Sequence, residues 1–438
     1  MKLEVEFICQ DLIKPSSPTP HHLHHLRLSF LDGLQPPICM PIVLFYSKES
    51  NSENSVRCNE LKKSLSKTLT MFYPLAGRVN NNTFIDCNDE GAFFVQAQAN
   101  CQLSDILQNY NPSDSNKLIP LQPHQCKNYA TFFQVTFFNC GGLCVSFSLS
   151  HKLGDALSQF QFLNSWAVVA RGDSVISTPL FGTATLFPPI KLQSGFDAGV
   201  LVEKDNKIVT KRFIFKNSII EALRAKYADE IGYSPSRIVA LAGFIWSRFR
   251  AAVQRKEADG NIYSLHNLVN LRPKMERPLS NLSFGNLVTS ASVQANMNAK
   301  HDGDARIVSE MSNAIRSVNT EYVKYLQKTN VIINLMKEEV KKLVKGDVIG
   351  FYFTSLCKIP IYEVDFGWGK PVFVGSAQLP FKNQVSFLDT RKGGGVEAWV
   401  NLKEEDMAKF EIDKDLLEHV DDRPFMIETL KLDLNSRL

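Results

Sequence analysis

The stretch Leu143-Cys-Val-Ser-Phe-Ser-Leu-Ser-His151-Lys-Leu-Gly154-Asp155-Ala-Leu-Ser158 passes from a strand pattern into a helix pattern. Apolar side chains occupy every second position over residues 143–149, which predicts a strand. Apolar side chains close to one helical face follow, at Leu157, Phe160, Leu163 and Trp166. The pattern therefore places His151 at the end of a strand and Asp155 at the start of a helix, with the small Gly154 between them.

A histidine at such a junction is suited to take a proton from a bound nucleophile, because its unperturbed pKa lies near neutrality. Two roles are open to Asp155: its carboxylate accepts a hydrogen bond from the imidazole, or it folds back and holds the loop. A purely structural interpretation stands beside both, since a histidine with an aspartate four residues on often occurs by chance. A second motif far along the chain is needed to choose.

The composition is that of a globular protein with sizeable cores, because 44% of the 438 residues are hydrophobic and 21% are charged. The formal net charge is +4 and Lys and Arg form no long runs, which argues against a nucleic-acid-binding protein. Nine cysteines without a CxxC pair, and no apolar run of about 18–20 residues, predict reduced thiols and no membrane span. The His-rich segment 21–25 has no second ligand group at zinc-like spacing, so we predict no metal site.

Strand and helix patterns occur in both halves of the chain. Between the halves lies a Pro-, Gly- and Thr-rich stretch, from Ser177 to about Asp205, that lacks clear periodicity. We therefore predict an α/β protein with two similar-sized domains, 1–190 and 207–438, joined by a crossover linker at 191–206.

The second motif is Asp365-Phe366-Gly367-Trp368-Gly369, which stands between two predicted strands. Its glycines permit unusual backbone dihedral angles and its aromatic side chains anchor a core, so the motif predicts a tight turn. Asp365 requires a partner in this interpretation, such as an arginine.

Together with His151 and Asp155, about 210 residues upstream, this motif resembles the HxxxD and DFGWG pair of the plant BAHD family of acyl-CoA-dependent acyltransferases. The resemblance extends over nearly the whole chain. Supporting segments are Leu28–Asp32, Tyr73–Arg78, Asn270–Arg272, Ser283–Asn286 and Gly395–Val400.

The resemblance implies two chloramphenicol-acetyltransferase-like α/β domains, with an active-site channel at their interface. His151 is then the general base that deprotonates the acceptor, and the acyl group passes directly from CoA without an acyl-enzyme. Asp155 is mainly architectural and pairs with Arg272. The DFGWG residues, Asp365 to Gly369, support the fold and the CoA side.

The resemblance also implies a role for the segment Thr354-Ser355-Leu356, where many relatives have Thr-Ser-Trp. The Thr354 hydroxyl is expected to contact the acyl group or the developing oxyanion. Leu356 departs from the family's tryptophan, which changes the shape of the pocket at that point. Gly154 and Leu356 are expected to line the channel.

The segment 353–371 is most similar to the alkaloid-acetyltransferase branch of the family, which contains vinorine synthase. This implies acetyl-CoA as the co-substrate, an alkaloid hydroxyl as the acceptor, no permanently bound cofactor, and a monomer. Malonyl- or branched acyl-CoA donors and terpenoid, sugar or phenolic acceptors are the alternatives. The family's usual compartment is the cytosol, but the terminal Ser436-Arg437-Leu438 resembles a peroxisomal signal.

Three other functions match the sequence less well than the acyltransferase does. A condensation enzyme that takes acyl groups from a carrier protein usually has HHxxxDG, where this chain has Ser150 and Ala156. A catalytically silent binding protein is disfavoured because His151, Asp155 and Thr354 are all present. A serine hydrolase is disfavoured because the chain has no GxSxG elbow.

Overall fold

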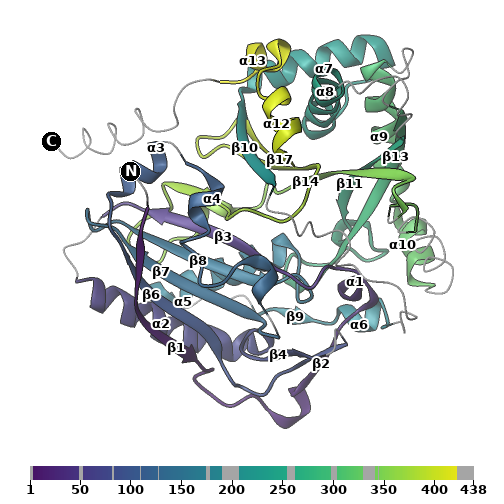
Figure 1. Cartoon of the computed structure of the whole chain (residues 1–438). Coiled ribbons are helices and arrows are strands. Elements are labelled where there is room, and N and C mark those ends of the chain that lie inside the picture. The colour runs from purple at the N-terminus through teal and green to yellow at the C-terminus, as the bar shows by residue number, and fades with distance from the viewer. Residues whose placement is uncertain are drawn as a thin grey trace.

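Two six-stranded mixed sheets form the framework of the protein, as a computed structural model shows (Figure 1). The structure describes residues 3–48, 53–80, 83–108, 110–126, 128–173, 178–189, 207–253, 262–296, 303–328, 341–343 and 345–421. The predicted linker, 191–206, and the terminal tripeptide 436–438 lie outside these ranges.

The first sheet has the strand order β1-β6-β7-β8-β3-β15. Its strands are β1 (Val5–Ile13), β6 (Ala92–Ala99), β7 (Thr131–Phe137), β8 (Leu143–Ser150), β3 (Cys39–Tyr46) and β15 (Phe373–Gly375). Only β6 and β7 run parallel, and the other neighbouring pairs are antiparallel. The sheet is therefore assembled from segments far apart in the chain.

Two long helices, α2 (Asn54–Met71) and α5 (Ala156–Arg171), cover one face of the first sheet (Figure 1). Three of the apolar positions predicted from the α5 pattern, Phe160, Leu163 and Trp166, are buried, whereas Leu157 is only half-buried. The Trp166 indole donates to the Leu61 carbonyl (3.3 Å) and to Ser64 Oγ (3.1 Å) of α2. A buried indole N–H requires such a partner, so this contact fixes how the two helices pack.

The second sheet has the order β10-β17-β16-β14-β11-β13. Its strands are β10 (Ile208–Phe215), β17 (Val396–Lys403), β16 (Gln384–Asp389), β14 (Val348–Ser355), β11 (Ile262–Asn270) and β13 (Val288–Asn296). A second hydrophobic core lies between this sheet and its helices. These helices are α7 (Asn217–Ile231), α8 (Arg237–Ala252), α9 (Asp304–Ser317), α12 (Glu404–Phe410) and α13 (Lys414–His419).

Two strand pairings join the halves of the chain. β15 adds to the edge of β3, with Phe373 opposite Phe45, although its residues lie within the predicted second domain, 207–438. In the other pairing, β9 (Leu180–Phe181) runs parallel to β12 (Ser283–Phe284). The halves therefore share backbone hydrogen bonds as well as side-chain contacts.

Smaller elements complete the chain. They are β2 (His25–Arg27), β4 (Arg78–Asn80), β5 (Phe84–Asp86), α1 (Phe30–Gly33), α3 (Leu103–Gln108), α4 (Pro112–Ser115), α6 (Thr183–Leu186) and α10 (Thr320–Gln327). Short 3-10 helices lie at His21–Leu23, Tyr73–Ala76, Pro123–Gln125, Arg272–Lys274 and Ile361–Glu363.

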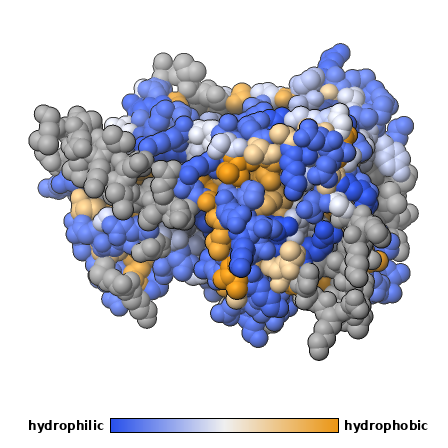
Figure 2. Space-filling view, turned by 90° about the horizontal axis from the view of Figure 1, so that it is seen from above, coloured by the Kyte–Doolittle hydropathy of each residue, from blue (hydrophilic) through white to orange (hydrophobic). Residues whose placement is uncertain are grey.

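Within the described ranges, no helix is long and apolar enough to cross a membrane, and no cluster of His, Cys, Asp and Glu side chains could hold a metal ion. All nine cysteines are free thiols. On the face seen from above, hydrophilic residues predominate and hydrophobic residues gather near the middle (Figure 2). Apolar surface is therefore open on that face.

Candidate active site

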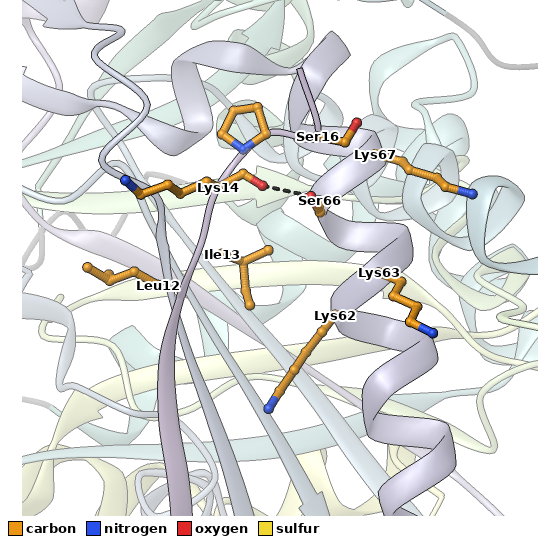
Figure 3. A pocket seen from close by; sticks show the side chains of 9 residues that line it. Leu12, Ile13, Lys14, Ser16, Lys62, Lys63, Ser66 and Lys67 are labelled. Atoms are coloured by element: carbon orange, nitrogen blue, oxygen red, sulfur yellow. Dashed lines mark hydrogen bonds between the residues drawn. The ribbon is translucent and has the colours of Figure 1, made fainter. Parts of the chain in front are cut away.

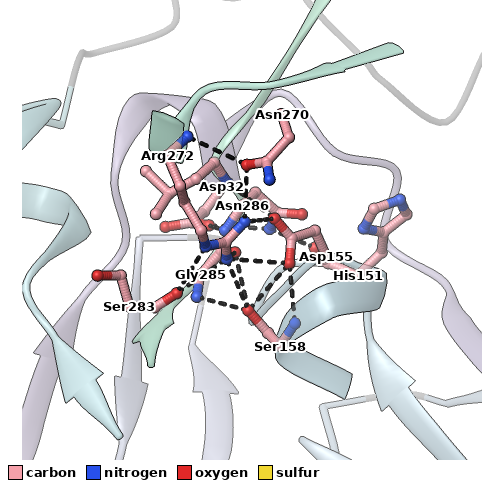
Figure 4. A network of polar contacts seen from close by, with 10 residues as sticks. Asp32, His151, Asp155, Ser158, Asn270, Arg272, Ser283, Gly285 and Asn286 are labelled. Carbon is pink, nitrogen blue, oxygen red and sulfur yellow. Dashed lines mark hydrogen bonds and ion pairs between the residues drawn. The ribbon is translucent and has the colours of Figure 1, made fainter. Parts of the chain in front are cut away.

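His151 directly follows the last residue of β8 and is partly buried. Its backbone N–H donates to the Ile38 carbonyl at 2.8 Å, which continues the pairing of β8 with β3 by one residue. Figure 4 shows the imidazole extending away from Asp155 and its polar partners. The ring is therefore available to a substrate rather than held by the aspartate of its own motif.

Asp155 is the N-cap of α5, and its Oδ1 accepts from the Ser158 backbone N–H at 3.0 Å. Its carboxylate also forms a bidentate ion pair with Arg272, with Nη1–Oδ2 at 2.7 Å and Nη2–Oδ1 at 3.1 Å. The pairing expected from the sequence is thus present. Of the two roles that the sequence left open for Asp155, the geometry matches the one in which it folds back and holds the loop.

The Arg272 side chain is 1% exposed, and its remaining donors are also bound. Nε and Nη2 donate to the Ser283 carbonyl at 3.1 and 2.8 Å, and Nη2 also lies 3.2 Å from Ser158 Oγ. A buried ion pair is stable only when its leftover donors are satisfied in this way. The network therefore ties the start of α5 to the second half of the chain.

Glycines give this network its close packing. Gly285 has φ +140°, and a Cβ there would come 2.4 Å from Thr183 Cγ2, so no larger residue fits. Gly154 is buried, and a Cβ there would lie 2.8 Å from the Ser158 Cβ. Gly154 thus leaves room for Ser158, and its place on a channel wall stays a prediction.

A second polar cluster, which the sequence did not indicate, joins Asp32, Asn286 and His151. Asp32 caps α1 by accepting from the Ser29 N–H (2.8 Å) and hydroxyl (2.6 Å). Its other oxygen accepts from the Asn286 N–H (3.0 Å) and Nδ2 (2.8 Å), and the same Nδ2 donates to the His151 carbonyl at 2.8 Å. Segments containing Asp32 and Asn286 support the family resemblance, but their contact across 254 positions leaves no local sequence signal.

Burial lowers the pKa of the His151 imidazole below its usual value. The backbone of His151 itself, the Asp155 charge and the Asn286 side chain raise this pKa, whereas the neighbouring Lys152 ammonium lowers it. Lys152 is buried and donates to the Gly33 carbonyl at 2.8 Å. The imidazole is consequently neutral at neutral pH, which is the state that a general base requires. Burial also raises the pKa of the Asp32 carboxyl, and hydrogen bonds from Ser29 and Asn286 oppose that shift.

Thr354 and Leu356 lie at the end of β14 and just beyond it, and both are partly buried. Leu356 packs against the core of the first half, and Thr354 pairs with Ser386 of β16. No hydrogen bond joins Thr354 to His151 in the described part of the chain. The contact of Thr354 with an acyl group therefore stays a prediction.

The turn Asp365–Gly369 lies on the first sheet, away from the His151 network. Asp365 Oδ1 accepts from the backbone N–H groups of Gly367 (2.8 Å) and Gly369 (3.0 Å), and both glycines have positive φ. The expected arginine partner of the Asp365 carboxylate is absent among the described residues, since Arg171 donates to the Asp365 backbone carbonyl instead. The carboxylate is used within the turn because two free N–H groups lie within its reach.

Aromatic side chains anchor this turn. Phe366 is 3% exposed and makes edge contacts with Trp166 of α5 (4.8 Å) and Tyr46 of β3 (6.0 Å between ring centroids). Trp368 stacks on Phe366 at 5.7 Å. The turn thus fastens a segment of the second half to the core of the first.

A groove of about 540 Å³ lies elsewhere, between the end of β1 and α2 (Figure 3). Its charged lining is Lys14, Lys62, Lys63 and Lys67. Lys62 pairs with Asp11 at 2.6 Å. None of the lining residues belongs to the His151 network, so this groove is separate from the candidate site.

Comparison with known proteins identifies the family. The model of the Transferase family matches residues 3–417. Stemmadenine O-acetyltransferase of Catharanthus roseus is 35% identical over 427 residues, covering 94% of this chain and 97% of the relative. Limonoid 1-O-acetyltransferase of Citrus sinensis is 32% identical over 436 residues, covering 95% and 98%.

Solved structures agree with this family assignment. The crystal structure of vinorine synthase is 32% identical and superimposes with a TM-score of 0.83, covering 96% of this chain and all of that one. Fusarium sporotrichioides TRI101, solved with coenzyme A and T-2, has the same fold at 18% identity and a TM-score of 0.72, covering 90% of this chain and 99% of that one. The chain therefore belongs to the Transferase (BAHD) family and is an acyl-CoA-dependent acyltransferase with that family's two-domain α/β fold.

Proposed function

We propose that the protein transfers an acetyl group from acetyl-CoA to a hydroxyl group of an alkaloid. The observation that carries the proposal is the His151 imidazole, which is partly buried, kept neutral by its surroundings and not bound by Asp155. Relatives that cover almost the whole chain support the donor and the acceptor class, since one is named as an O-acetyltransferase of stemmadenine.

His151 accepts the proton of the acceptor hydroxyl as the oxygen attacks the thioester carbonyl carbon. The tetrahedral intermediate then collapses, the carbon–sulfur bond breaks, and the CoA thiolate takes the proton from the imidazolium. No acyl-enzyme forms, because the acceptor attacks the thioester directly. The Thr354 hydroxyl donates to the oxyanion of the intermediate, and Leu356 shapes the acceptor pocket.

A terpenoid acceptor is the second candidate. It is favoured by the limonoid 1-O-acetyltransferase, whose identity to this chain is close to that of the alkaloid enzyme. The two candidates share the donor and the base and differ only in the acceptor. A direct assay on both classes of alcohol separates them.

The test is release of free CoA by the purified protein, with products identified by mass spectrometry. Acetyl-CoA and malonyl-CoA are each offered with hydroxylated indole alkaloids and with limonoid alcohols. We expect a gain of one acetyl group on an alkaloid, and no gain with His151→Ala. Acetylation of limonoids alone would show that the acceptor is a terpenoid rather than an alkaloid. Transfer of a malonyl group would show that the donor is malonyl-CoA rather than acetyl-CoA.

A further inference from the structure

The side-chain amide of Asn286 has one possible orientation. Asn286 is fully buried, and its Nδ2 donates to Asp32 Oδ1 and to the His151 carbonyl, each at 2.8 Å. Both amide hydrogens are therefore used. The opposite orientation would place Oδ1 against a carboxylate and a carbonyl, and neither group can donate a hydrogen bond.

This orientation leaves two complementary atoms without partners. In the described part of the chain, Asn286 Oδ1 and His151 Nδ1 are both buried and neither makes a hydrogen bond. An amide oxygen is an acceptor, and Nδ1 is a donor in one tautomer of the neutral ring and in the imidazolium. The two atoms belong to residues that are already joined through the His151 carbonyl.

Asp155 is not the acceptor of the His151 Nδ1–H. Its two oxygens already accept from Ser158, Arg272 and the Leu287 N–H. The imidazole also points away from it (Figure 4). Asp155 is therefore not the group that orients the His151 ring.

We propose that Asn286 is the positioning residue of His151: Nδ2 holds the His151 carbonyl, and Oδ1 accepts the Nδ1–H of the ring. The arrangement leaves Nε2 as the basic nitrogen that faces the acceptor hydroxyl. Asp32 does not contact the ring but holds Asn286 in place, because its Oδ1 accepts from both the backbone N–H and Nδ2 of Asn286. The inference rests on the proposed role of His151 as the general base.

In this arrangement the orientation of the His151 ring depends on residues from both halves of the chain. Asn286 follows β12 in the second half, whereas Asp32 and His151 belong to the first. His151 is thus aligned for chemistry only when the two halves are docked.

The direct test is NMR titration of ring-labelled histidine in the full-length protein without substrates, with the His151 signal assigned by its loss in His151→Ala. In the wild type we expect a neutral ring protonated at Nδ1. In Asn286→Ala we expect a mixture of tautomers and a lower His151 pKa, because the imidazolium loses an acceptor. The other charges near the ring, those of Asp155 and Lys152, are unchanged in this comparison.

The matched control is Gln161→Ala. Gln161 of α5 donates to the Leu282 carbonyl at 3.2 Å, so this variant removes another hydrogen bond between the halves without touching His151. We expect Gln161→Ala to keep the wild-type tautomer and pKa. If Asn286→Ala matches this control and only melts at a lower temperature, Asn286 is merely structural and the inference is wrong.

Kinetics supply the second readout. We expect Asn286→Ala to lower kcat about 10- to 100-fold, a part of what general-base catalysis contributes, with the KM for acyl-CoA nearly unchanged. If Asn286→Ala does not fold, Asp32→Asn is used in its place. We expect it to lower the His151 pKa by a smaller amount than Asn286→Ala would. A tautomer and pKa like those of the wild type in Asp32→Asn would overturn the inference. The titration requires no acceptor alcohol, so the two proposals are tested separately. If the protein acetylated none of the offered alcohols, the proposed function would be wrong, but the titration would still show whether Asn286 orients the His151 ring.

Discussion

The Arg272 guanidinium lies 2.7 Å from the Asp155 carboxylate across 117 positions of sequence. Both side chains are buried, so the pair is shielded from solvent and salt. The contact joins the start of α5 to the loop after β11, and hence one half of the chain to the other. The aspartate of the HxxxD motif is in this sense part of the interface between the halves.

Replacing Asp155 by alanine should destabilise the protein strongly. The change leaves the buried Arg272 charge without its partner, which typically costs about 3–5 kcal/mol. Thermal unfolding should show a large drop in Tm and lower soluble yield. Glu221→Ala, which breaks a solvent-exposed pair with Arg224, is the control and should change Tm little. A variant of Asp155 with full stability and lost turnover would instead place Asp155 in the chemistry.

Replacing His151 by alanine should remove most activity while the fold remains. The imidazole is partly exposed and contributes little to either core, so Tm should stay close to that of the wild type. Loss of a general base typically costs about 10²–10⁴-fold in rate. Free-CoA release under saturating acetyl-CoA measures this, and near-normal turnover would refute the mechanism.

The pH profile should follow His151. Because burial lowers its pKa, the acidic limb of kcat/KM should lie below pH 6.5, with activity lost as the ring takes up a proton. Asn286→Ala should move this limb to still lower pH. A limb centred above pH 7 in the wild type would contradict a base whose pKa is lowered by its surroundings.

Protonation of His266 should lower the stability of the protein in mild acid. The His266 ring stacks on the Tyr352 ring, with 4.7 Å between the ring centroids. Burial lowers the pKa of His266 to about 4, whereas the unfolded chain takes up this proton near pH 6.5. The unfolded state therefore binds more protons between these values, and the free energy of unfolding decreases as the pH is lowered from about 6.5 to 4. Urea unfolding at pH 7 and pH 5 should show a smaller loss for His266→Gln than for the wild type.

Replacing Phe366 by alanine should weaken the attachment of the DFGWG turn. Removal of a buried phenylalanine typically costs about 3–5 kcal/mol, and Phe366 contacts both Trp166 and Tyr46. We expect a lower Tm, with the His151 tautomer unchanged in protein that remains folded. Phe7→Ala, at an exposed position on β1, should have almost no effect.

Local features of the fold were predictable from sequence. The change from a period of two to a helical period around His151 gives β8 and α5 within a residue or two, because both patterns reflect burial of neighbouring positions. The residues of 304–328 show no change of pattern at the break between α9, which ends at Ser317, and α10, which begins at Thr320. Asn319 caps α10 there, and a single cap of this kind is easily missed within a long helical pattern.

Long-range contacts were not predictable from the residues themselves. The three residues of β15 have no signal that assigns them to β3 rather than to their sequence neighbours. The Asp155–Arg272 pair was expected only through the family resemblance, and the link from Asp32 through Asn286 to His151 was not expected at all. Such contacts depend on which loops the docked halves bring together, and periodicity records only local burial.

The pairing of β15 with β3 bears on attempts to produce the halves separately. A fragment that ended at residue 190 would lack β15, so the backbone of β3 would become an open sheet edge, which is a common template for aggregation. It would also expose apolar positions that Phe366 and Phe373 cover in the whole protein. Residues 361–377 thus cover a sheet edge and an apolar surface of the first half, so we expect that half to aggregate when it is produced without them.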